Sequence, residues 1–120
     1  MNKVLKMLIK EIIHNSILYH ERLNSGDKYT VFDNQHKEIL SVNDGWATNY
    51  YSISINKKII LAVRWDETNS KPLTNDQKDM IDIINVCKEK IDLQETAQTM
   101  TNHELEMASF LQQSLCKTAV

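Results

Sequence analysis

The sequence YYSISINKKIILAVRW, residues 50–65, contains the clearest structural pattern in the chain. Apolar residues stand at every second position from Tyr51 to Ile55, as in a strand with one buried face. The Asn-Lys pair that follows fits the two-residue turn of a β-hairpin. Residues 59–63 are then continuously apolar, which is typical of a strand buried on both faces. We therefore predict a hairpin whose second strand lies at the centre of a sheet.

A long helix is predicted after this hairpin. Thr74 and Gln77 form a capping-box pattern, in which each side chain bonds to the backbone of the other residue. From there to Leu115 no Gly or Pro interrupts the chain, so the helix would run for roughly 40 residues, or about 60 Å. One small sheet does not need a helix of that length. Part of it must project from the domain or pair with another chain.

The two halves of this helix differ in their apolar pattern. Up to Ile91 the helix is apolar enough to lie on the sheet. Beyond that point a narrow seam repeats about every 3.5 residues, which favours a coiled coil in a parallel homodimer. A tail that frays or folds back is the alternative, because Glu104 interrupts the seam and the repeat is short. The dimerisation residues would be Leu93, Ala97, Met100, Met107, Leu111 and Leu115.

The segment before residue 50 supplies a helix and another hairpin. A helical period runs over residues 3–23, and Gly26 would end the helix in the left-handed conformation. Residues 28–34 and 38–42 then read as two strands joined by a turn. The sequence thus predicts an α+β fold, with four antiparallel strands between an N-terminal and a long C-terminal helix. We assign residues 1–92 to the domain and residues 93–120 to a signalling helix.

Composition excludes several classes of protein. The chain has 120 residues, a net charge of −2 and 25% charged residues, so it lacks the basic excess of nucleic-acid-binding proteins. No apolar run approaches the roughly 18–20 residues of a membrane span. Cys87 and Cys116 match no zinc pattern. We expect a soluble, cytoplasmic protein with neither nucleic acid nor membrane as a partner.

Residues with catalytic chemistry are present but scattered. His14 and His20 are six positions apart and face different sides of the predicted first helix. Cys87 and His103 are too distant along one helix to form a nucleophile and its base. The chain has only 2 glycines, so no Gly-rich loop can cradle phosphates. We therefore predict that the chain has no catalytic residue, metal site or cofactor. We also predict that it is not an enzyme.

Aromatic residues give the one candidate for a ligand pocket. Trp46 follows a turn predicted at Asn43-Asp44-Gly45, and Trp65 ends the last predicted strand. Aromatic side chains in such places can line a small-molecule cavity. They more often fill the end of a small sheet against a helix. The candidate pocket residues are Trp46, Tyr51, Arg64 and Trp65.

Leu73, Thr74 and Asp76 open the long helix after two strands, a tight turn and a polar loop. In this order of elements, residues 51–92 resemble the C-terminal half of a GAF domain, and PAS-like sensors share much of the architecture. The first helix and hairpin fit the same order. GAF domains usually carry a helix-bearing insertion between their second and third strands, which closes the ligand pocket. Here only residues 43–49 stand in that place, so the resemblance implies a GAF-like fold with little to enclose a ligand.

The string ELEMASFLQQSL, residues 104–115, carries a second resemblance. It is similar to the helix that leads into SpoIIE-like (PPM-type) serine phosphatase domains, with Ser109 in place of the usual Arg. In that family a sensor domain regulates metal-dependent catalysis through the dimeric arrangement of such helices. The resemblance implies that this chain is the regulatory input region of a bacterial serine phosphatase, with a protein partner in a signalling cascade. The alternative is a stand-alone GAF- or PAS-type module that binds a small molecule.

Overall fold

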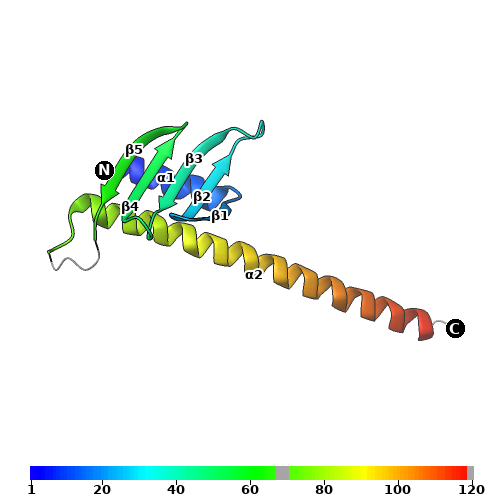
Figure 1. Cartoon of the computed structure of the whole chain (residues 1–120). Coiled ribbons are helices and arrows are strands. Elements are labelled where there is room, and N and C mark those ends of the chain that lie inside the picture. Colours follow the sequence, from blue (N-terminus) through cyan, green and yellow to red (C-terminus); the bar gives the residue numbers. More distant parts are fainter. Residues whose placement is uncertain (67–70, 119–120) are drawn as a thin grey trace.

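The computed structural model describes residues 1–66 and 71–118, with side chains as far as residue 98, and shows an antiparallel sheet flanked by two helices (Figure 1). The α+β class predicted from sequence is confirmed, with five strands in place of the expected four. The elements are α1 (Lys3–Asn15), β1 (Tyr19–Leu23), β2 (Gly26–Phe32), β3 (Glu38–Asp44), β4 (Tyr50–Ile55), β5 (Lys58–Arg64) and α2 (Asn75–Thr118). The strands follow one another in sequence order across the sheet.

The additional strand is β1, which the helical period had assigned to the end of the first helix. The helix instead stops at Asn15, and Ser16 is already extended, with φ −124° and ψ 166°. Residues of β1 then pair with β2, from Tyr19 opposite Thr30 to Leu23 opposite Gly26. Pairing across the sheet overrides the local helical pattern here. The prediction of Gly26 as a helix cap was wrong, because this glycine is the first residue of β2.

The second hairpin forms as predicted, but its position in the sheet differs. Asn56 and Lys57 have φ values of 49° and 67°, as a two-residue turn with both residues left-handed requires. The prediction that β5 is a central strand buried on both faces was wrong. Since the sheet is a simple meander, β5 has only β4 beside it and forms an edge. Ile59 is accordingly 57% exposed, although it belongs to a continuous apolar run.

Both helices pack on the same face of the sheet. Apolar residues at alternate positions of β2 to β5 form one buried cluster with residues of α1 and α2. Alternation places these strand residues on a single face, so the two helices share it. The buried cluster consists of Ile9, Ile13, Leu18, Tyr29, Val31, Leu40, Val42, Tyr51, Ile53, Leu61, Val63, Met80, Ile83, Ile84 and Cys87.

The two helices run side by side in the same direction. Near their beginnings, the Lys6 ammonium lies 3.0 Å from the Asp79 carboxylate and 2.5 Å from that of Asp82. Near the end of α1, the Lys90 ammonium donates to the carbonyl oxygen of His14 at 2.7 Å. Lys6 and its hydrogen bond hold the pKa of the Asp79 carboxyl below its ordinary value, despite the opposing effect of burial. These contacts fix α2 in register along α1.

The long C-terminal helix is a single element of 44 residues, as its sequence predicts. It begins with the expected capping box: Thr74 N donates to Gln77 Oε1 at 2.9 Å, and Gln77 N donates to Thr74 Oγ1 at 3.2 Å. Gln94 bonds through both ends of its amide to the backbone of Leu18, each time at 2.8 Å. Beyond that residue α2 projects from the body of the domain, which gives the molecule a length of 72 Å (Figure 1).

Candidate functional site

A hollow of about 450 Å³ opens between the beginning of β2, the end of β3 and residues 81–88 of α2. Three of the four aromatic and basic residues proposed from sequence line it, namely Trp46, Tyr51 and Trp65. We call it the aromatic hollow. Its complete lining is Asp27, Asp44, Trp46, Tyr51, Trp65, Ile81, Ile84, Asn85 and Lys88.

Asp27 holds the indole of Trp46 in place. Its Oδ2 accepts a hydrogen bond from Trp46 Nε1 at 2.9 Å, and its Oδ1 lies 2.7 Å from both His20 Nε2 and Arg22 Nε. The Arg22 guanidinium also lies over the Trp46 ring, 5.5 Å from its centre, where the π-system attracts a cation. Burial would raise the pKa of Asp27, but the hydrogen bonds from these three partners outweigh it and lower the pKa below its ordinary value of 3.8.

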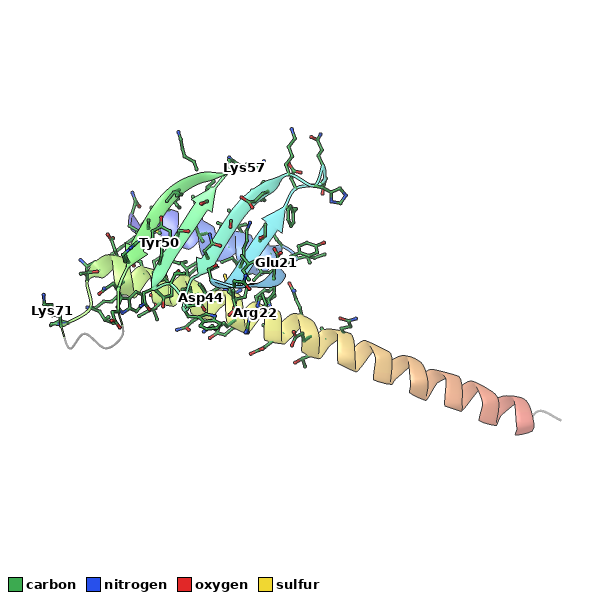
Figure 2. The ribbon with its side chains drawn as sticks, in the orientation of Figure 1. Glu21, Arg22, Asp44, Tyr50, Lys57 and Lys71 are labelled. Carbon is green, nitrogen blue, oxygen red and sulfur yellow. The ribbon has the colours of Figure 1, made fainter. Side chains whose placement is uncertain are left out.

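Asp44 contributes a second, more deeply placed carboxylate. Its side chain is only 8% exposed, and its Oδ2 lies 3.6 Å from the ammonium of Lys88, which is 55% exposed. The charge is felt by buried neighbours: burial raises the pKa of the Cys87 thiol to about 12, and Asp44 adds to that effect. Figure 2 shows Asp44 and Arg22 at the end of the sheet that borders α2, far from Lys57 at the opposite end.

The remaining aromatic wall is a pair of rings. Tyr51 and Trp65 lie 4.8 Å apart between ring centres and are tilted by 36°. The backbone N–H of Trp65 donates to Asn49 O at 2.9 Å, which fixes the chain just after β5. Arg64, the fourth residue proposed from sequence, lines a neighbouring hollow and lies over the ring of Tyr50, 5.7 Å from its centre.

Sequence reasoning missed both carboxylates of the hollow. Asp44 was assigned to a turn with Asn43 and Gly45, whereas it is the last residue of β3. Asp27 was placed in the linker after a helix, whereas it pairs with Asp44 across β2 and β3. Once β1 is known to be a strand, the alternation of His20 and Arg22 along it points both side chains toward Asp27. Both carboxylates were therefore missed because β1 was not recognised as a strand.

The dimerisation residues proposed from sequence all fall on α2. Leu93 is 64% exposed within the single chain, and Ala97 is also exposed. Met100, Met107, Leu111 and Leu115 lie in the helical backbone, but their side chains are outside the described residues. The structure therefore places the beginning of the seam on an outward-facing part of the helix.

Acidification is expected to release Trp46 from Asp27. Because the pKa of Asp27 is lowered in the folded chain, its interactions stabilise the fold above about pH 4 and are lost as the pH falls through the lowered pKa. Tryptophan fluorescence followed from about pH 7 to about pH 2 should show this step. Asp27→Asn should remove the step and lower stability at neutral pH by about 2 kcal/mol, since it loses a charged acceptor. Asp92→Asn, at an exposed position of α2, is the matched control; an unchanged acid transition in Asp27→Asn would contradict the assignment.

Within the described part of the chain, no three His, Cys, Asp or Glu side chains gather as metal ligands would. Over the same residues, neither helix contains a stretch long and apolar enough to cross a membrane. Comparisons with protein-family models, with curated proteins and with solved structures give no match for this chain.

Proposed function

We propose that this chain is a non-catalytic regulatory and dimerisation module that passes a signal through its C-terminal helix. The observation that carries the proposal is the length of α2 relative to the body it covers. The helix has 44 residues, about 66 Å at 1.5 Å per residue, and Gln94, whose amide bonds to the backbone of Leu18, lies before its midpoint. The projecting part needs a second surface to cover its apolar seam, and a second copy of the chain supplies an equivalent one.

The direction of the seam supports pairing with another helix. Asp79 and Lys90 lie on the side of α2 that faces α1. Ala97 is seven residues beyond Lys90, so it returns to within about 20° of the same side. Since α1 ends at Asn15, the seam begins where α1 no longer lies beside α2. The seam thus continues, beyond the domain, the same side of α2 that contacts a helix within it.

A second apolar surface lies on α1. Val4, Met7 and Leu8 occupy positions i, i+3 and i+4 and are 64%, 62% and 49% exposed. They lie roughly opposite Ile9 and Ile13, which face the sheet. Contiguous exposed apolar side chains on a helix are typical of an interaction surface. In a parallel dimer this stripe would extend the contact from the tails onto the helical layer of the domain.

The two sequence resemblances give the proposal its biological setting. A GAF- or PAS-like domain followed by a helix similar to that of SpoIIE-like phosphatases supports an input region for a cytoplasmic serine phosphatase. A change at the domain would alter how the two α2 tails pack. Interruption of the seam by Glu104 favours two arrangements of similar stability, which a switch requires. Catalysis would reside in the phosphatase domain and not in this module.

Removing the tail is expected to weaken self-association. Sedimentation equilibrium of the full chain should show a reversible dimer, whereas a version ending after Gln98 should dissociate at least about tenfold more readily. This truncation keeps Gln94 and therefore its contacts with Leu18. Equal dimer populations in the two proteins would contradict the proposal.

A point substitution refines this test. Leu93→Lys places a charge in the seam and should likewise weaken the dimer about tenfold. Gln98→Lys adds the same side chain at an exposed position about 140° away around the helix, and should leave association unchanged. Similar effects of both substitutions would show that net charge and not the seam governs association.

A second candidate function is binding of a small molecule at the aromatic hollow. It is favoured by the convergence of Trp46, Tyr51 and Trp65 with two carboxylates in one concave place. Such binding would supply the signal that the tails transmit. A thermal-shift screen with metabolites tests it, because a ligand that binds only the folded state raises the unfolding temperature. The absence of any reproducible shift would count against it.

A further inference from the structure

The aromatic hollow combines a buried carboxylate with three aromatic side chains. The Asp44 side chain is 8% exposed and lines the hollow together with Trp46, Tyr51 and Trp65. The face of an aromatic ring attracts a cation through its quadrupole, and a neighbouring carboxylate adds a direct charge interaction. These are the groups with which proteins recognise organic ammonium ions. The volume of about 450 Å³ is suited to a small metabolite.

One such arrangement already exists within the chain, where a basic side chain contacts both a carboxylate and an aromatic ring. Arg22 bonds to Asp27 at 2.7 Å and lies over Trp46 at 5.5 Å from the ring centre. Asp44 also has a basic neighbour, Lys88, but these two groups lie farther apart than Arg22 and Asp27. Lys88 lies 3.6 Å from the carboxylate, beyond direct hydrogen-bond distance, and its side chain is 55% exposed. An exposed lysine at this distance can swing into solvent with little loss of stability.

We propose that the aromatic hollow binds a small alkylammonium compound, with the ammonium group beside Asp44 and against the rings of Trp46 and Trp65. Two sources of this group are distinguishable. A simple cation such as choline would displace Lys88, whereas a zwitterion such as glycine betaine would present its carboxylate to Lys88. The inference rests on the second candidate function, ligand binding at the hollow, and is independent of the dimer.

The tryptophans themselves provide the measurement. The chain has 2 tryptophans and both line the hollow, so intrinsic fluorescence reports on its occupancy without a label. The full chain is titrated with choline, with glycine betaine and with 3,3-dimethylbutan-1-ol, the neutral carbon isostere of choline. A saturable change is expected for at least one of the two ammonium compounds. The isostere should bind about tenfold more weakly, since it keeps the shape and loses the charge.

Two substitutions in the hollow test the assigned roles. Asp44→Asn should weaken binding of either ammonium compound about tenfold. Because Asp44 is buried and its replacement can disturb folding, Lys88→Met supplies a second variant at an exposed residue. It should tighten choline binding severalfold by removing the competing cation, or weaken betaine binding severalfold by removing the carboxylate partner. Lys78→Met, at another exposed lysine of α2, is the matched control and should change neither.

The outcomes distinguish the proposed class of ligand from the more general proposal that the hollow binds a ligand. Tighter choline binding in Lys88→Met identifies a simple cation, and weaker betaine binding identifies a zwitterion. Equal binding of choline and its neutral isostere overturns the ammonium assignment while leaving ligand binding in place. Lys88→Met without effect on either compound also overturns it. So does the absence of saturable change for both ammonium compounds up to about 50 mM.

Discussion

Replacing Gly26 with alanine is expected to destabilise the domain by about 3 kcal/mol or more. Gly26 has a φ of +145°, which L-residues with a side chain rarely adopt. An added Cβ would stand 2.0 Å from the carbonyl oxygen of Asp44 and 3.0 Å from the backbone nitrogen of Trp46. Both neighbouring atoms belong to the backbone, so the clash cannot be relieved by rotating a side chain. The paired ends of β2 and β3 would have to separate.

Urea unfolding of Gly26→Ala measures this effect, at a single protein concentration because a dimer would couple association to stability. Ser25→Ala is the matched control. It lies next to Gly26 at an exposed position, keeps its backbone carbonyl for the bond from Ala47 N, and should change stability by no more than about 0.5 kcal/mol. Since Asp44 and Trp46 both line the aromatic hollow, Gly26→Ala should also change tryptophan emission under native conditions. A variant of unchanged stability would mean that β2 and β3 do not approach each other so closely.

Local sequence signals were sufficient for most elements of this fold. The capping box at Thr74, the turn at residues 56–57 and the uninterrupted helix that follows all depend on residues close together in the chain. These local preferences agree with the final structure because no contact with distant residues opposes them. The strand β1 could not be predicted in this way, since its residues Tyr19 and Leu23 also fit the helical period. Their conformation is decided by pairing with β2, which a local pattern does not contain.

The candidate site was also predictable only in part: its tryptophans were predicted, and its carboxylates were not. Trp46, after a predicted turn, and Trp65, at the end of a predicted strand, were selected because aromatic residues in such places can line a cavity, and both line one hollow. The carboxylates Asp27 and Asp44 were not selected, because acidic residues near turns are common and nothing local distinguishes these two. They meet only when β2 and β3 are paired in register. Chemistry that depends on register across strands is invisible until the pairing is known.

Replacing isoleucines of β4 and β5 with alanine tests whether β5 is an edge strand. One of these substitutions should have the second large effect on stability. Ile53→Ala is expected to destabilise the domain by about 3 kcal/mol, because Ile53 is 0% exposed within the cluster that joins sheet and helices. Ile59→Ala removes the same atoms from an edge strand where the side chain is 57% exposed, and should lower stability by about 1 kcal/mol or less. Had β5 been central and buried on both faces, the two losses would be similar. Urea unfolding of both variants under identical conditions therefore decides between the apolar run as a buried strand and as an edge, and equal losses would contradict the sheet order described here.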